Sequence, residues 1–393
     1  MILPKHIKSI LDRLDGAGFD AYVVGGSLRD ALLGRDANDW DIASSALPDQ
    51  VISLFSDKHV IPTGLKHGTV TVISDGEPVE ITTFRIDGEY SDLRHPESVS
   101  FARRVEDDLA RRDFTVNAMA YNEKRGLVDL FGGQHDLKSK IIRCVGDPEK
   151  RFQEDALRIM RAFRFASQLG FEIHPDTLNA AHKMGGGLES VARERIGAEF
   201  LRLIGGREPS GALLEMGSIL NMILPISIDT QRIETVSALE CDAVSRLAFL
   251  LCGATDERLN DASHLLRLSS KQEQRLKKLT SPPTKDELDG LTPSGARRIL
   301  ANYGEDSVNA AKISVLLYGS DGNSVALLRR IEEEHPCISL SDLAISGTDL
   351  IKENIAEGKL IGEILHALLD AVIEAPSLNE RQALLDLAKR LSK

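Results

Sequence analysis

The stretch from residue 21 to residue 43 constrains the fold and chemistry of this chain more than any other segment. It begins with an apolar run, Ala21-Tyr-Val-Val24, which predicts a buried strand leading directly into Gly25 and Gly26. A short helix is expected to start at Ser27, a good N-cap residue beside backbone N–H groups that suit phosphate oxygens. The pattern therefore predicts a phosphate-binding turn between a strand and a helix.

Two aspartates follow this turn. Residues 39–43, Asp-Trp-Asp-Ile-Ala, are typical of a second strand. Because side chains i and i+2 share one face of a strand, Asp39 and Asp41 are expected to point together toward the glycine turn. Two carboxylates facing a phosphate site require a cation between them, and Mg²⁺ prefers oxygen ligands. The combination predicts metal-assisted nucleotidyl transfer, with Asp39 and Asp41 as catalytic residues and Mg²⁺ ligands.

The order of these elements matters more than either one alone, since glycine turns and Asp-x-Asp pairs are each common in ordinary proteins. A P-loop is excluded because the chain has no Gly-x-x-x-x-Gly-Lys-Ser/Thr, and a dinucleotide-binding fingerprint is absent as well. The net charge of −12 argues against general coating of nucleic acid, although it leaves room for a local basic groove.

The cellular compartment is also constrained by composition. The four cysteines are scattered and form no Cys-x-x-Cys pair, so neither a zinc site nor a disulfide framework is indicated. The first residues lack the apolar core of a signal peptide, and no apolar run approaches membrane-spanning length. We therefore expect a cytoplasmic protein without a membrane partner, and no protein partner is implied.

The texture of the chain changes near residue 145. Before it we predict a helix over residues 6–15 and strands at 20–24, 39–43, 58–61, 68–73, 78–84 and 127–130. From about residue 148 onward apolar residues recur at helical spacing, and no strand is expected. The predicted fold is an α+β head with a mixed sheet followed by an all-α neck, body and tail, with boundaries at 1–145, 146–205, 206–285 and 286–393.

Two further segments of the head hold candidate site residues. If the strand carrying Glu80 neighbours the aspartate strand, Glu80 is a third carboxylate that could help bind a second metal ion or accept a proton. The alternative is a solvated glutamate. Residues 106–119 predict a charged helix start that runs into an arginine pair, where Arg112 suits triphosphate or ribose contacts and Asn117 could read a sugar hydroxyl. Taken alone, the arginine pair is typical of a surface face.

A row of arginines follows in the predicted neck. Asp155 and Arg158 are expected on one helix face, and Arg161 and Arg164 continue the row. An ordinary salt-bridged helix has the same spacing. Cytosine and adenine, however, each present an amine donor beside a ring acceptor, which an aspartate acceptor next to an arginine donor complements. Guanine and uracil present an imino N–H and carbonyls there, so such a helix could select C and A without a template.

Together these motifs resemble those of the class II tRNA nucleotidyltransferases, namely the bacterial and eukaryotic CCA-adding enzymes, and of the related bacterial poly(A) polymerases. The resemblance covers residues 20–170 and rests on Gly25-Gly-x-x-Arg-Asp-x-Leu-Leu-Gly-Arg35, Asp39-x-Asp41, Val79-Glu-Ile-Thr-Thr-Phe-Arg85, Arg111-Arg-Asp-Phe-Thr-x-Asn-Ala118 and Glu154-Asp-x-x-Arg-x-x-Arg-x-x-Arg-Phe165. It fades through residue 230 and is faint beyond.

The resemblance implies a polymerase-beta-like nucleotidyltransferase head, Mg²⁺ as cofactor, ATP and CTP as substrates, and a tRNA acceptor arm along the helical half. It implies Mg²⁺ on Asp39 and Asp41 and base selection by Asp155 and Arg158. The remaining residues implied to bind or support the nucleotide are Gly25, Gly26, Arg29, Arg112, Asn117, Arg161 and Arg164.

Three activities compete within this family. Poly(A) polymerases usually carry a basic C-terminal extension, whereas this chain ends in a short Lys389-Arg-Leu-Ser-Lys393. CC-only enzymes typically lack the loop before the Arg-Arg-Asp motif, whereas residues 85–101 predict a long polar loop that moves as substrate binds. Addition of C, C and A is therefore favoured. The alternatives from other classes are a small-molecule or protein nucleotidyltransferase and a non-enzymatic RNA-binding protein.

Overall fold

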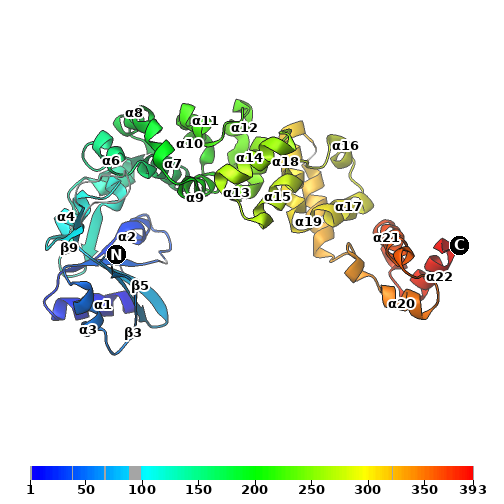
Figure 1. Ribbon diagram of the computed structural model, residues 1–393, viewed down its shortest axis with the longest axis horizontal. Helices are drawn as coiled ribbons and strands as arrows, with labels where there is room; N and C mark the ends of the chain where they lie inside the picture. Colours follow the sequence, from blue (N-terminus) through cyan, green and yellow to red (C-terminus); the bar gives the residue numbers. More distant parts are fainter. Residues whose placement is uncertain (1, 38, 66–67, 88–98, 321, 393) are drawn as a thin grey trace. The chain divides into compact units, whose positions relative to one another are not determined.

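The computed structural model describes residues 2–37, 39–65, 68–87, 99–320 and 322–392. It separates into two compact units, the first made of Met1–Ser227 with His264–Arg267 and the second of Ile228–Ser263 with Leu268–Lys393. Strands are confined to the first unit among the described residues, and helices make up the rest (Figure 1). The predicted α+β head followed by helices is confirmed. The finer division at residues 145, 205 and 285 stays a prediction.

A seven-stranded mixed sheet lies at the centre of the head. Its strands follow the order β3-β4-β5-β2-β1-β8-β9, with every neighbouring pair antiparallel except the parallel pair β2 and β5. The strands are β1 (Ala21–Val24), β2 (Asp41–Ser44), β3 (His59–Gly64), β4 (Thr69–Ser74), β5 (Glu77–Thr83), β8 (Met119–Asn122) and β9 (Gly126–Asp129).

The two faces of this sheet are covered by different cores, because side chains alternate along each strand. Val23 and Ile42 point into a core shared with α1 (Lys5–Gly16) and α3 (Pro48–Leu54). The apolar residues of α1 recur at the spacing of one helix face, and those buried are Ile7, Ile10, Leu11 and Leu14. Val24 and Ala43 pack on the opposite face with α4 (Val105–Ala110). Asp41 lies on the same face as Ala43.

The bounds of two predicted elements differ from the structure, and one strand of the sheet was not predicted. Strand β2 begins at Asp41 rather than at residue 39. The helix predicted from residue 106 ends at Ala110, and the chain continues through a 3-10 turn, Thr115–Asn117, into the unpredicted strand β8. β8 is short and mostly buried between β1 and β9, so it lacks the polar alternation that marks a strand in sequence.

The two ends of the predicted polar loop at residues 85–101 form a short pair of strands. Strands β6 (Arg85–Asp87) and β7 (Val99–Phe101) pair antiparallel, while residues 88–98, on which the prediction of a moving loop depends, lie outside the described residues.

Helices complete the first unit. They are α2 (Gly25–Leu32), α5 (Gly133–Ser139), α6 (Pro148–Glu154), α7 (Leu157–Leu169), α8 (Pro175–Met184), α9 (Arg193–Ile204), α10 (Pro209–Met216) and α11 (Ser218–Ile223). The prediction of no strand beyond residue 148 is wrong, because the short strand β11 (Glu172–Ile173) lies there. It pairs in parallel with β10 (Ile141–Ile142). Two-residue strands leave no periodic signal in the sequence.

The second unit is built on two apolar cores, one over residues 288–331 and the other over residues 343–388. Its helices are α12 (Thr230–Thr235), α13 (Ala243–Leu251), most of α14 (Asp256–Leu266), α15 (Ser270–Leu279), α16 (Lys285–Leu288), α17 (Pro293–Tyr303), α18 (Ser307–Tyr318), α19 (Asn323–Glu333), α20 (Gly347–Lys352), α21 (Lys359–Glu374) and α22 (Arg381–Leu391). Within the described part of the chain, no helix has both the length and the apolarity needed to cross a membrane.

Candidate active site

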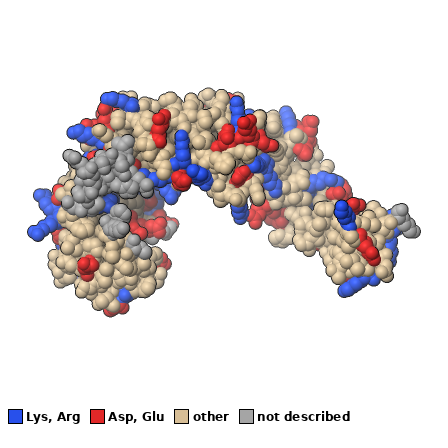
Figure 2. Space-filling view, in the orientation of Figure 1, with Lys and Arg blue, Asp and Glu red and all other residues tan. Residues whose placement is uncertain are grey.

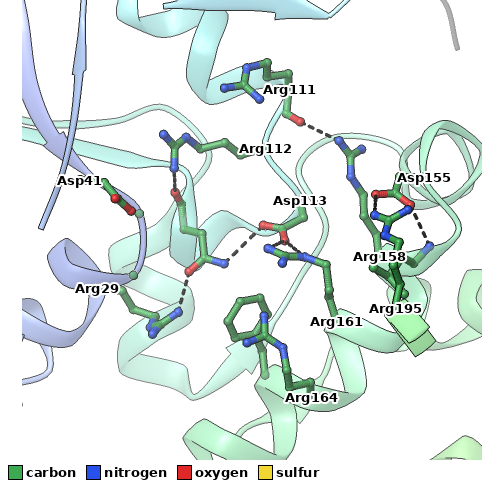
Figure 3. Close-up of a pocket in the computed structure, with 15 residues that line it drawn as sticks. Arg29, Asp41, Arg111, Arg112, Asp113, Asp155, Arg158, Arg161, Arg164 and Arg195 are labelled. Atoms are coloured by element: carbon green, nitrogen blue, oxygen red, sulfur yellow. Dashed lines mark hydrogen bonds and ion pairs between the residues drawn. The ribbon is translucent and has the colours of Figure 1, made fainter. Parts of the chain in front are cut away.

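A cavity of about 540 Å³ in the first unit is lined mainly by charged side chains. Seven arginines and three aspartates line it together with glycine, asparagine and apolar residues, so its charge is strongly positive. The lining residues are Gly25, Gly26, Arg29, Asp41, Arg111, Arg112, Asp113, Asn117, Asp155, Leu157, Arg158, Arg161, Arg164, Phe165 and Arg195 (Figure 3). Guanidinium groups in this number suit a polyphosphate.

All nine predicted nucleotide-binding residues and Asp41 line this one cavity, whereas Asp39 and Glu80 do not. The structure therefore brings together side chains from β2, α2, the segment after α4, and α7. Residues that are far apart in the chain therefore line the same cavity.

The glycine turn brings the backbone against the charged groups of the cavity. Gly25 has φ +75°, and a Cβ built on it would lie 3.4 Å from Arg112 Nη1 and 3.5 Å from Asp41 Oδ2. A side chain at this position would be strained and would crowd both charges. Helix α2 begins at Gly25 rather than at Ser27 as predicted, and the Ser27 hydroxyl donates to the Val24 carbonyl instead of capping.

The carboxylates of the head are arranged by strand register. Asp41 and Glu80 are direct partners across the parallel pair β2–β5, so their side chains share a face. The hypothesis that the Glu80 strand neighbours the aspartate strand is thus confirmed. Asp39 is exposed in a bend before β2, so the argument that it shares a strand face with Asp41 is wrong.

The pKa of Asp41 reflects this crowding of negative charge. Solvent still reaches the side chain, but partial burial by the surrounding protein, followed by repulsion from Glu80, raises its pKa to about 6. Arg112 opposes this shift, and Asp39 adds to it. A bound cation would relieve the repulsion.

A metal would find an incomplete set of protein ligands here. Among the described residues, no three or more His, Cys, Asp and Glu side chains converge to hold a metal ion. Asp41 has Glu80 beside it in the sheet and Asp39 close enough to perturb its pKa. Mg²⁺ at nucleotide sites is commonly held by one or two carboxylates, with phosphates and water as its other ligands. These oxygen donors therefore fit a hard divalent cation that binds together with a nucleotide.

Asn117 connects three charged residues that line the cavity. Its Oδ1 accepts from Arg29 Nη1 at 2.8 Å, its Nδ2 donates to Asp113 Oδ1 at 3.3 Å, and its backbone oxygen accepts from Arg112 Nη1 at 3.3 Å. The side chain is buried, so in this structure it orients three charged residues. Its predicted role as a reader of a sugar hydroxyl is not tested by these contacts.

Asp113 ties the head to helix α7. Its Oδ2 accepts from Arg161 Nε at 2.8 Å, and its Oδ1 accepts from the Phe114 backbone N–H at 2.8 Å. Burial alone would raise the pKa of Asp113, but attraction to Arg161 and hydrogen bonding outweigh it and lower the pKa to about 2. The carboxylate is thus held ionised by a partner 48 residues away in sequence.

The sequence predicted Asp155 on the same helix as the arginines, but in the structure it lies just before that helix, α7. It follows the last residue of α6, and its Oδ1 accepts at 3.0 Å from the backbone N–H of Leu157, the first residue of α7. Its Oδ2 accepts from Arg195 Nη2 at 3.3 Å. Asp155 and Arg158 nevertheless both line the cavity (Figure 3).

Arg158 is held by other partners. Its Nη1 donates to Glu154 Oε2 at 2.5 Å, and its Nη2 donates to the backbone oxygen of Arg111 at 3.1 Å. The side chain is buried, so these contacts fix the direction of the guanidinium. The alternative of a salt-bridged helix therefore describes part of the arrangement, with Glu154 rather than Asp155 as the acid.

Arg164 and Arg195 complete the arginine set from α7 and α9. Arg164 Nε lies 2.6 Å from Glu199 Oε2, but the pair is not aligned as a hydrogen bond, and neither atom has such a partner among the described residues. Burial lowers the pKa of Arg164 to about 10. Sequence analysis did not name Arg195 as a site residue, although the stretch that contains it, Ser190-Val-Ala-Arg-Glu-Arg-Ile196, still fits the family resemblance.

Comparison with known proteins identifies related families and relatives. A family model described as "Poly A polymerase head domain" matches residues 21–143. Models for a "Probable RNA and SrmB- binding site of polymerase A" and for tRNA nucleotidyltransferase domain 2 match residues 170–226 and 298–388. The CCA-adding enzyme of Ligilactobacillus salivarius is 37% identical over 401 residues, covering 98% of this chain and 96% of the relative. That of Bacillus cereus is 34% identical over 393 residues, covering 97% and 96%.

The fold gives the same result. The crystal structure of the Bacillus stearothermophilus CCA-adding enzyme in complex with CTP is 33% identical, with a TM-score of 0.81 over 99% of this chain and 98% of that one. Both similarities extend over nearly the whole chain, well beyond the 20–170 segment in which the motifs lie. The chain therefore belongs to the family of CCA-adding enzymes and is a nucleotidyltransferase.

Proposed function

We propose that this protein adds C, C and A to the 3′ end of tRNA, using CTP and ATP and releasing pyrophosphate. One observation carries the proposal: Asp41, the glycine turn and the arginines of α7 line a single cavity in a chain that is 37% identical to a CCA-adding enzyme over nearly its full length. The tRNA and its nucleotides are cytoplasmic molecules and the four cysteines are free, so we place the protein in the cytoplasm.

The catalytic carboxylates in this proposal are Asp39, Asp41 and Glu80. Asp39 and Asp41 would hold Mg²⁺, which when bound would neutralise charge on the triphosphate and on the attacking oxygen. The 3′-hydroxyl oxygen of the tRNA forms a bond to the α-phosphorus, and the bond to the pyrophosphate oxygen breaks. Glu80, beside Asp41 in the sheet, accepts the hydroxyl proton.

The nucleotide phosphates bind at the glycine turn. Gly25 and Gly26 begin α2, whose unpaired N–H groups face anions, and Arg29 and Arg112 flank the turn. Asn117 orients both arginines, so the charges are in place before the nucleotide arrives. Preorganised donors of this kind stabilise the charge that develops as pyrophosphate leaves.

Base selection is assigned to Asp155 and Arg158, with Arg161 and Arg164 in support. Their hydrogen-bonding groups complement the edges of cytosine and adenine. Because Arg158 is bound to Glu154 and Asp155 to Arg195, contacts within the protein hold both base-selecting side chains in position. Selection in this proposal depends on the distance between them.

Replacing Arg158 by alanine should blur the choice of C and A over U and G. We expect discrimination to fall by about 10- to 100-fold, as for the loss of one charged hydrogen bond. Single-nucleotide incorporation with each triphosphate measures it. Arg151→Ala is the matched control, since Arg151 also pairs with Glu154, at 2.9 Å, but does not line the cavity. Equal discrimination in both variants would mean that the base is read elsewhere.

The head model that matches this chain is named for poly(A) polymerases, so repeated addition of A is the second candidate. The test is incubation with tRNA lacking its last three nucleotides, CTP, ATP and Mg²⁺, followed by sequencing of the product ends. We expect C-C-A and then arrest. A poly(A) tail, or arrest after C-C, would instead assign the related activities, and no extension with any nucleotide would contradict the proposed function.

A further inference from the structure

A second cavity of about 470 Å³ lies in the first unit and shares no lining residue with the active cavity. Its lining comes from the last residues of α5 and α7 and from the chain that follows α2, α5, α7 and α9. The residues are Leu33, Arg35, Leu137, Lys140, Leu169, Gly170, Phe171, Arg207 and Glu208. Three of them are cations and one is an acid.

The cations of this cavity are poorly satisfied by the protein. Lys140 and Arg207 are exposed, and neither side chain has a hydrogen-bond or ion-pair partner among the described residues. Arg35 makes one long contact, from Nη2 to the Leu169 oxygen at 3.4 Å. The chain has a net charge of −12, and over the face seen in Figure 2 its Lys and Arg are interspersed with Asp and Glu. A local excess of unpaired positive charge in such a protein suits an anion.

The cavity also has apolar lining residues. Leu137, Leu169 and Phe171 are 6%, 5% and 8% exposed, so each presents only an edge to the cavity. Cations beside apolar side chains complement a nucleotide unit, whose phosphate is charged and whose sugar and base have apolar faces.

Two helices connect this cavity to the active cavity. α2 begins at Gly25 and Gly26 in the active cavity and is followed by Leu33 and Arg35 in the second. α7 lines the active cavity as far as Phe165 and the second cavity with Leu169, so along this helix the two linings are about 6 Å apart at 1.5 Å per residue. The two cavities are therefore held next to each other by the same helix.

We propose that this second cavity binds the phosphate backbone of the tRNA substrate, outside the nucleotide to which the next residue is added. The inference rests on the proposed function. It is supported by the family model for an RNA-binding site, which covers residues 170–226 and so includes Phe171 and Arg207. A strand held at both cavities would keep its 3′ end in register during successive additions.

The test is the triple variant Arg35→Gln, Lys140→Gln and Arg207→Gln. Fluorescence anisotropy with labelled tRNA should give a Kd at least about tenfold weaker, and the slope of log K against log salt should fall by about 2 to 3, since three phosphate contacts are lost. KM for tRNA should rise, whereas KM for CTP and kcat at saturating tRNA should stay unchanged. Arg207→Glu, at an exposed position, should weaken tRNA binding more than Arg207→Gln.

The matched control is the triple variant Lys5→Gln, Lys8→Gln and Lys124→Gln. It removes the same number of positive charges as the test variant, but from α1 and from the turn between β8 and β9. Equal tRNA affinity and salt slope in the two triple variants would overturn the inference. Weaker binding of CTP or inorganic phosphate with unchanged tRNA binding would also overturn it, by assigning the cavity to free nucleotide or phosphate. Failure of the unmodified protein to extend tRNA would contradict the proposed function instead.

Discussion

Replacing Asp41 by alanine should reduce nucleotidyl transfer by about 10³-fold or more while tRNA binding stays within about twofold. The expected loss corresponds to about 4 kcal/mol of transition-state stabilisation, the scale of metal and charge effects in such sites. Asp41 is the one proposed catalytic carboxylate that lines the active cavity, and it has Glu80 beside it. Single-turnover incorporation of CMP and of AMP, each with the matching shortened tRNA, measures the effect.

Glu77→Ala is the control for this variant, because Glu77 is an exposed acid on the same strand as Glu80 and lies outside the cavity. It should retain full activity. Asp39→Ala should resemble Asp41→Ala if both bind Mg²⁺, with a raised Mg²⁺ requirement as the common sign. Near-normal turnover in the Asp41 variant would refute the assignment of the metal and of the reaction centre together.

Replacing Asp113 by asparagine should destabilise the first unit by about 2 kcal/mol at neutral pH. Asparagine has nearly the same shape but carries no charge, so the ion pair between the buried position 113 and Arg161 is lost. The magnitude follows from the lowering of the Asp113 pKa from 3.8 to about 2, since each pKa unit corresponds to about 1.4 kcal/mol. Nucleotide binding should weaken as well, because Asp113 also holds Asn117.

The pH dependence of this loss has a definite sign. Because the pKa of Asp113 is lower in the folded state, the stabilisation is complete above the unfolded value of 3.8 and is lost as the pH falls through about 2. The difference in free energy of unfolding between the two proteins should therefore shrink as the pH falls below 3.8 toward about 2. Urea titrations followed by Trp40, the single tryptophan and a core residue of the head, report on this unit.

Asp107→Asn removes a partly exposed charge from the preceding helix α4 and should be nearly neutral at every pH. If Asp113→Asn is equally neutral, the Asp113–Arg161 pair does not hold the head to α7. A difference between the two variants that stays constant from pH 7 to pH 3 would show that packing, and not the ion pair, causes the loss.

The local elements of the head could be predicted because their signals lie within short windows of sequence. The buried residues of α1 recur on one helix face, and β1 is an uninterrupted apolar run, so each predicts its own structure. The predicted bounds of β3, β4, β5 and β9 came within a few residues for the same reason. Elements with a weak local signal, β8 above all, were missed.

The composition of the active cavity was largely predicted, but its geometry was not. Motif order and resemblance indicated ten of the residues that line it. The contacts that orient them join Arg29 to Asn117, Arg161 to Asp113 and Arg195 to Asp155, across 88, 48 and 40 residues. No local pattern encodes such pairs, so the role of Arg195 and the separation of Asp155 from α7 could not be inferred.

The sequence alone thus determined the kind of chemistry, because the order of residue types sets which charges and donors are available to a nucleotide. It did not determine the positions of the side chains, since a shift of one or two residues in where a strand begins decides which carboxylate lies in the strand. Asp39 was expected in β2 and lies before it, while Asp41 meets Glu80 only because β2 and β5 pair in parallel. Packing of distant segments decides that pairing, and the second cavity arises in the same way, where the ends of four helices meet.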